Sequence, residues 1–511
     1  MRPSILCFVL AATVSGQAAF PVETRTSEGV RIWDFGGASA DDFSFAVFVA
    51  AGSRLENPDE YGVAHLVEHC LFRSTALRSH EAVLELLKRC SYNGFTSFDQ
   101  TVYHFAANAN DALPLIELFG EMLTKPAFAE DEVEAERRIV FEEITQRDMH
   151  VSINTLEDLV YPGDPLGRSI GGDRDAVKAT STETVKAFYS EHYRRGNVIV
   201  AFRGGGDRRA IAATLDAAFA GLPEGGGSRP RVSTPAGRTG VSIVGNPMEE
   251  KAVLFSGFHV SERTTTGLAA LWVLEQWLHE RFTQVARHER GLAYAPSVQS
   301  IVRMGAWRLQ AAAESSRQEN IREIDQILTE ITGEVAGITE EQFERARSAA
   351  LADLIPENPA QLAAVVYKTW ILMHLGSMPP DPCREVLALT REDFVRAAAG
   401  LTEARRYRLT NDPTLGSPAS PPWLGILGVI VGGLLIIDAF FGFRGARGLI
   451  ERPLSLVRGV RSGLLSAREQ RRARHQRQLD ARTLQDEIQA WYSGEEQEHR
   501  TPADDQTDPS P

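Results

Sequence analysis

The segment HLVEH, residues 65 to 69, combines residue types that can bind a metal ion and move a proton. If it forms a helix, His65 and His69 are one turn apart, so both imidazoles leave the same face and Glu68 projects beside them. Two neutral imidazoles suit zinc, and a nearby carboxylate can take a proton from water that zinc has acidified. The competing interpretation is a helix that carries two histidines and a glutamate without any metal.

A third ligand is expected on residues 131–146, whose apolar residues recur with a helical period. At 100° per residue they form one stripe, made of Val133, Ile139, Val140 and Ile144. Glu136 and Glu143 fall within this stripe, and a carboxylate on a buried stripe is costly unless it is paired or bound to metal. We therefore predict that Glu143 is the third ligand and that Glu136 orients one of the others. The alternative is that both are paired with Arg137, Arg138 or a distant arginine.

The elements that position these residues can be traced from hydrophobic periodicity. In the first half, strands are predicted at 43–50 and 101–107. Helices are predicted through His65 and at 82–88, 112–123 and 131–146. The second half repeats this order, with strands at 253–258 and 306–313 and helices at 266–285, 320–336 and 338–354. Thr339 is the predicted N-cap of the last helix. The fold class is therefore α+β, with two similar domains, each a mixed, mostly antiparallel sheet packed with helices.

The length of 511 residues exceeds one ordinary core and suits two domains of roughly 200 residues. Residues 223–240 are rich in Gly, Pro and Ser and are predicted to be the linker. It separates a zinc-binding domain, 20–222, from a second domain without the metal motif, 241–412. The formal net charge of -14 argues against a nucleic-acid partner, because phosphate contacts need clustered Lys and Arg.

Both ends of the chain carry membrane signals. Residues 1–19 place Arg2 before a short apolar run that ends in small residues, which is typical of a cleavable secretory signal, with an N-terminal anchor as the alternative. Residues 423–443 are apolar with one charge, Asp438, and could span a hydrocarbon core of about 30 Å. The tail that follows, 444–511, is basic and then acidic.

The arginine-rich start of this tail predicts that it is cytoplasmic. The protein would then be single-pass and membrane-anchored, with its body in the periplasm or another extracytoplasmic compartment. In such a compartment disulfides can form, but the mature chain holds an odd set of cysteines, Cys70, Cys90 and Cys383. Free buried thiols are favoured, and a Cys70–Cys90 disulfide is the alternative.

HLVEHCLFRST, together with the EAERRIVFEEI helix, resembles the pitrilysin and mitochondrial processing peptidase family, the inverzincins. Further similarity lies in NGFTSFDQTVYHF (93–105), YPGDPLGRSIGG (161–172), FYSEHYRRGNVIVAFRGG (188–205) and RHERGLAY (287–294), so the resemblance covers roughly residues 25–412. Two positions depart from the family pattern. Cys90 stands where the family often has Gly, and Gly94 stands where Ala is more usual.

The resemblance implies one Zn²⁺ per chain and peptide hydrolysis as the activity. His65, His69 and Glu143 would be its ligands and Glu68 the general base. Beyond the metal it implies three further residues: Arg287 and Tyr294 stabilising the oxyanion, and Asn93 contacting the peptide.

The expected function is that of a zinc metalloendopeptidase whose peptide substrate adds as an extra strand to the first-domain sheet. Two-domain members of the family usually work in pairs, so a homodimer, or a heterodimer with a related chain, is implied. The rival hypothesis is a catalytically inactive member that serves as a scaffold or assembly subunit.

Overall fold

The computed structural model describes residues 21–37, 40–147, 153–226, 237–245, 251–261, 263–377, 380–400 and 406–412. All of them belong to one compact unit, Met1–Ser417. The predicted signal 1–19, the apolar segment 423–443 and the tail 444–511 lie outside the described residues, as does much of the predicted linker. Within the described part of the chain, no helix is long and apolar enough to cross a membrane.

The first half of the unit contains a mixed six-stranded sheet with the order β1-β2-β6-β3-β5-β4. The β2–β6 pair is parallel and the other neighbouring pairs are antiparallel. The strands are β1 (Val22–Arg25), β2 (Arg31–Asp34), β3 (Asp42–Val49), β4 (Cys90–Thr96), β5 (Thr101–Asn108) and β6 (Val198–Gly204).

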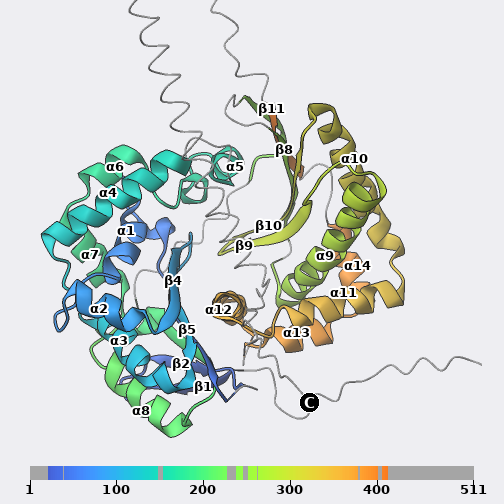
Figure 1. The fold of residues 1–511 in the computed structure, drawn as a ribbon. Coiled ribbons are helices and arrows are strands. Elements are labelled where there is room, and N and C mark those ends of the chain that lie inside the picture. Colours follow the sequence, from blue (N-terminus) through green and yellow to red (C-terminus); the bar gives the residue numbers. More distant parts are fainter. Residues whose placement is uncertain are drawn as a thin grey trace, which may run out of the picture. The chain divides into compact units, whose positions relative to one another are not determined.

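Eight helices belong to this half among the described residues. They are α1 (Val63–Leu71), α2 (His80–Leu87), α3 (Ala112–Thr124), α4 (Glu130–Arg147), α5 (Ile153–Val160), α6 (Arg174–Ala179), α7 (Thr182–His192) and α8 (Arg208–Phe219). The helices α1, α2, α3 and α8 gather on one side of the sheet (Figure 1), where α1 and α2 contact β4 and α3 contacts β5.

The second sheet repeats the plan of the first. Its order is β7-β11-β8-β10-β9, with β7 and β11 parallel and the remaining pairs antiparallel. Its strands are β7 (Gly240–Gly245), β8 (Ala252–Val260), β9 (Ser297–Arg303), β10 (Ala306–Ser315) and β11 (Arg406–Asp412). With β1 set aside, both sheets therefore have the same connectivity, which confirms the predicted two-domain α+β fold.

The helices of the second half are α9 (Thr265–Thr283), α10 (Gln318–Glu334), α11 (Glu340–Ala352), α12 (Pro359–His374), α13 (Pro382–Ala388) and α14 (Arg391–Ala399). Thr339 is the N-cap of α11, as predicted, and it also forms a complete capping box with Gln342. The helix predicted over 266–285 differs at its end, because α9 stops at Thr283 and a π-helix continues over Gln284–Glu289. A π-helix closes i→i+5 hydrogen bonds, so it does not follow the 3.6-residue period from which the helix was predicted.

Strand β3 shows how the two halves share a core. Its alternating side chains divide between two faces: Phe45 and Val47 join the cluster beneath α1 and α3, whereas Phe48 joins the cluster of the second half. The ring centroid of Phe48 lies 5.4 Å from that of Trp370 on α12. A helix of the second half thus covers the face of the first sheet that its own helices leave open.

Candidate metal centre

Helix α1 carries the HLVEH residues and begins at a tightly packed glycine. Gly62 has φ +99°, and a Cβ there would approach Gly171 O to 2.5 Å, so only glycine fits. Glu56 accepts a hydrogen bond of 3.0 Å from the N–H of Ala64, next to His65. Burial raises the pKa of Glu56 to about 8, against the opposing effect of hydrogen bonds from Gly62 and Ala64. The first turn of the helix is therefore held at Ala64, one residue before His65.

His65 and His69 lie side by side on α1, as the spacing predicts. Their ring centroids are 4.7 Å apart and the rings are nearly perpendicular. Glu143 on α4 approaches both imidazoles with one oxygen: its Oε2 is 3.7 Å from Nε2 of His65 and 3.8 Å from Nε2 of His69. The structure thus brings together the three side chains that were predicted as metal ligands, from two helices that are distant in sequence.

This donor set suits zinc. Zinc holds nitrogen and oxygen ligands at about 2.0–2.2 Å in a tetrahedron, which places neighbouring donor atoms roughly 3.3–3.6 Å apart. The separations from Glu143 to the two histidines exceed that range by only a few tenths of an ångström. His65, Glu68 and His69 also offer donor atoms within 4.8 Å of one another, so Glu68 and Glu143 are both candidates for the carboxylate ligand.

The surroundings of Glu68 distinguish the two carboxylates. Glu68 is buried, and its Oε2 accepts a hydrogen bond of 2.6 Å from the Thr96 hydroxyl on β4. Its Oε1 lies against Gly94, where an added Cβ would be only 2.9 Å away. Burial raises the pKa of Glu68 to about 7, although the Thr96 hydrogen bond opposes that rise. The side chain of Glu68 therefore packs against β4 beside the histidines. Its raised pKa lies near neutral pH, as a general base requires.

The two carboxylate oxygens of Glu136 contact different residues, His69 and Arg73. Its Oε2 is 2.8 Å from Nδ1 of His69, and its Oε1 accepts from Nε and Nη2 of Arg73. Burial raises the pKa of Glu136, but the His69 hydrogen bond and the Arg73 charge outweigh it, so the net shift is downward. Glu136 thus contacts His69, one of the predicted ligands, and Arg73 is a partner that sequence periodicity did not indicate.

The same contacts affect His69. Burial lowers its pKa, but the hydrogen bond to Glu136 and the charges of Glu68 and Glu143 raise it further, so the net pKa lies above the usual value. A metal bound at Nε2 requires a neutral ring. In the absence of metal, the acidic surroundings thus favour a proton at the place where zinc would bind.

One part of the predicted stripe on α4 is wrong. Val133, Glu136, Val140 and Ile144 are buried, but Ile139 is 44% exposed and the side chain of Glu143 is 48% exposed. Ile139 precedes Val140 by one residue and so lies 100° away from it on the helix, outside the buried stripe. Glu143 lies at the edge of the stripe rather than in its middle, from where it reaches both histidines.

Strand β4 forms an edge of the first sheet. It pairs only with β5 among the described strands, and Asn93 on it is exposed, its Oδ1 accepting a hydrogen bond of 2.9 Å from the N–H of Gly94. The unusual residues Cys90 and Gly94 leave the strand regular, in continuous register with β5. The thiols of Cys70, Cys90 and Cys383 are free.

Arg287 and Tyr294 contact each other. The Arg287 guanidinium lies 5.0 Å from the centre of the Tyr294 ring, and Tyr294 is 82% exposed. Within the described part of the chain, neither forms a hydrogen bond or ion pair with His65, His69 or Glu143. Their predicted role in stabilising an oxyanion stays a prediction.

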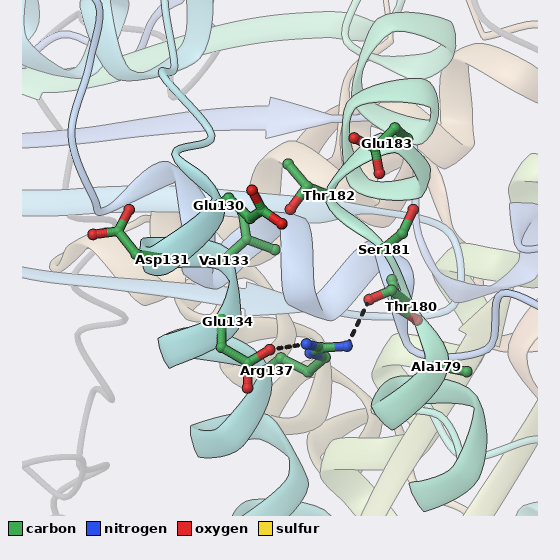
Figure 2. A pocket seen from close by; sticks show the side chains of 10 residues that line it. All are labelled: Glu130, Asp131, Val133, Glu134, Arg137, Ala179, Thr180, Ser181, Thr182 and Glu183. Atoms are coloured by element: carbon green, nitrogen blue, oxygen red, sulfur yellow. Dashed lines mark hydrogen bonds and ion pairs between the residues drawn. The ribbon is translucent and has the colours of Figure 1, made fainter.

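A surface pocket lies at the start of α4. Figure 2 shows it between the first turns of α4 and the α6–α7 connection, where Arg137 bridges Glu134 and the Thr180 carbonyl. Its lining includes none of the predicted site residues. The predicted metal-binding residues thus do not line this pocket.

Comparison with known proteins bears on this site. Residues 38–174 match the family described as insulinase (peptidase family M16), and residues 180–350 match the peptidase M16 inactive domain. An uncharacterised zinc protease of Rickettsia felis is 22% identical over 73% of this chain and 92% of its own length. The mitochondrial-processing peptidase subunit beta of Saccharomyces cerevisiae is 23% identical over 81% of this chain and 95% of its own length.

Solved structures show the same fold. A protease from Helicobacter pylori superposes with a TM-score of 0.68 at 19% identity, covering 77% of this chain and all of that one. The first half of the periplasmic protease PqqL from Escherichia coli gives a TM-score of 0.61 at 18% identity, covering 78% of this chain and 93% of that one. Together, the two adjacent family matches and the paired sheets establish that this chain belongs to peptidase family M16, the insulinase family.

Proposed function

We propose that this chain is a membrane-anchored zinc metalloendopeptidase that hydrolyses peptides or unfolded segments in an exported compartment. The observation that carries the proposal is the approach of Glu143 Oε2 to within 3.7 and 3.8 Å of the Nε2 atoms of His65 and His69. The zinc-protease names of relatives that share most of this chain support the same metal.

In the proposed mechanism, His65, His69 and Glu143 hold one Zn²⁺. Zinc supplies Lewis acidity, which polarises a carbonyl and acidifies water. Glu68 accepts the proton of the attacking water on its carboxylate and passes it to the nitrogen of the leaving amine. The Thr96 hydroxyl keeps Glu68 oriented during both transfers, since it donates to Oε2 and leaves Oε1 to exchange the proton.

The substrate would bind along β4. This strand lies at the edge of its sheet, so its outward N–H and C=O groups can pair with an extended peptide regardless of sequence. Asn93 is exposed on that strand and would contact the peptide. Arg287 and Tyr294 would supply donors to the oxyanion, within the chain or from a second copy, in keeping with a homodimer or a heterodimer with a related chain.

The location is proposed from the sequence signals at the two ends. Residues 1–19 would direct export, residues 423–443 would anchor the chain, and residues 444–511 would remain cytoplasmic. The periplasmic protease PqqL, which shares the fold, is a precedent for this compartment. Protease added to intact spheroplasts should degrade the body and leave a C-terminal fragment; protection of the whole chain would contradict this topology.

The metal and the activity are tested together on the purified chain. Wild-type protein should bind one equivalent of zinc and cleave unfolded peptides, and Glu68→Gln should retain zinc and lose at least about a hundredfold in turnover. Glu143→Gln should weaken zinc binding, whereas Glu142→Gln, at the adjacent exposed position of α4, should not. A wild-type chain that binds no zinc would refute the proposal. Zinc binding without any cleavage would favour the scaffold alternative instead.

A further inference from the structure

Arg73 lies just beyond the end of α1, four residues after His69. Its N–H donates to the carbonyl of Cys70 at 3.1 Å, so the chain is still turning helically there. The i, i+4 spacing puts Arg73 on the same side of the chain as His69. Both side chains contact the same residue of α4, Glu136.

The Glu136 carboxylate is divided between these two partners. Nε and Nη2 of Arg73 both bind Oε1, while Oε2 is 2.8 Å from Nδ1 of His69. Glu136 is only 7% exposed and the Arg73 side chain 20% exposed, so little water is available to replace either contact. Two donors of the rigid guanidinium converge on Oε1, which holds the position of this oxygen more firmly than one flexible ammonium group would.

We propose that Arg73 is a positioning residue of the metal site, acting through Glu136 on the orientation of His69. With Oε1 held by Arg73, Oε2 is directed at Nδ1, and a ring that donates Nδ1–H to a carboxylate keeps the lone pair of Nε2 for a metal. That Nε2 is the atom facing Glu143. The inference rests on the proposed zinc site but does not require that the chain be catalytic.

The experiment measures zinc affinity rather than activity. The full-length chain is stripped of metal and titrated with zinc against a chelator of known affinity, for wild type, Arg73→Met, Glu136→Gln and the double variant. Arg73→Met and Glu136→Gln should each weaken binding about tenfold or more. Because Arg73 acts through Glu136, adding Arg73→Met to Glu136→Gln should cost less than twofold.

Arg78→Met is the matched control. Arg78 lies in the same loop and pairs with a buried glutamate, Glu121 on α3, which has no contact with the ligand histidines within the described residues. The zinc affinity of the Arg78→Met variant should stay within twofold of wild type. Equal weakening by Arg78→Met would mean that loss of any ion pair in this loop disturbs the site, and would overturn the proposal.

A second variant covers the case in which Arg73→Met does not fold. Arg73→Lys keeps the charge but loses the rigid guanidinium, so it should weaken zinc binding by a few fold and change the visible absorption of the cobalt-substituted protein. Arg78→Lys should leave that spectrum unaltered. If Arg73→Met folds, wild-type zinc affinity in it, or full additivity with Glu136→Gln, would refute a role through Glu136. If it does not fold, wild-type affinity and spectrum in Arg73→Lys would refute that role. Zinc binding with no peptidase activity would refute only the proposed function.

Discussion

The Thr96 hydroxyl donates a hydrogen bond of 2.6 Å to Oε2 of Glu68, which joins the edge strand β4 to the proposed general base. The strand that would hold the peptide and the group that would move the proton are thus in direct contact. A displacement of β4 must therefore also displace Glu68. Sequence alone suggests no such contact, because Thr96 is 28 residues from Glu68.

The first prediction concerns Thr96. Thr96→Val removes the donor and leaves the buried carboxylate of Glu68 without it, so kcat should fall by about tenfold or more, as expected for a hydrogen bond to a charged group. KM for the peptide should change little, because β4 itself stays paired with β5. Steady-state kinetics on an unfolded peptide would measure both constants.

Thr96→Ser is the control for this change, since it keeps the hydroxyl and loses only a methyl group. It should retain kcat to within about threefold. If Thr96→Val were as active as Thr96→Ser, the hydrogen bond would have no part in orienting Glu68.

The second prediction concerns Gly94, which faces Glu68 from the same side of β4. A Cβ at this position would lie 2.9 Å from both Oε1 of Glu68 and the ring of Phe72, two side-chain ends that can move. Gly94→Ala should therefore shift Glu68 and lower kcat, while it costs only about 1 kcal/mol of unfolding free energy. Zinc affinity should be unchanged. A large drop in melting temperature would show instead that β4 cannot yield.

The sequence predicted the elements that carry their own periodic signal. Helix α4 was expected over 131–146 and runs Glu130–Arg147, and the N-cap at Thr339 follows from local residue types alone. The candidate residues of the metal site could be predicted from the sequence for the same reason. His65 and His69 share a helix face, and Glu136 is a carboxylate in a buried stripe. Each of these inferences needs only the geometry of one helix.

What the sequence did not predict depends on contacts between elements. Arg73 and Thr96 are ordinary polar residues whose roles appear only when α4 and β4 are brought against α1. Arg54 and Asp99 form a buried ion pair that also binds the backbone of Met304 in the second half, and neither was singled out. Tertiary packing decides which polar side chains meet, and no local pattern records it.

The third prediction is that zinc binding displaces a proton. Hydrogen bonding to Glu136 and nearby carboxylates hold the pKa of His69 above its usual value, so a larger fraction of rings is protonated near pH 7 without metal. Zinc requires the neutral ring, so its affinity should fall as pH drops through that pKa, by about tenfold per pH unit for one displaced proton. Calorimetry in buffers of different ionisation enthalpy would count the protons released.

Glu136→Gln offers a control for this linkage. It removes the negative charge and leaves at most a neutral hydrogen bond to His69, so the decline in zinc affinity should begin at lower pH than in wild type. Zinc affinity that is equal at pH 6 and pH 8 in the wild-type chain would contradict the linkage.

The fourth prediction concerns a buried ion pair between the two halves of the unit. Arg308 on β10 donates from Nη1 to Oε2 of Glu157 on α5 at 2.6 Å, and both side chains are less than 5% exposed. Arg308→Met leaves the buried carboxylate uncompensated, so unfolding free energy should fall by about 3–5 kcal/mol. In thermal unfolding the melting temperature should drop by roughly 5 °C or more.

The partner variant decides whether charge pairing is the cause. Glu157→Gln combined with Arg308→Met removes both charges, so the double variant should be more stable than Arg308→Met alone, because no unpaired charge remains buried. Lys88→Met, which breaks the exposed pair with Glu85, should leave the melting temperature unchanged because water screens both groups. A double variant no more stable than Arg308→Met would mean that lost packing, rather than a stranded charge, weakens the junction of α5 with β10.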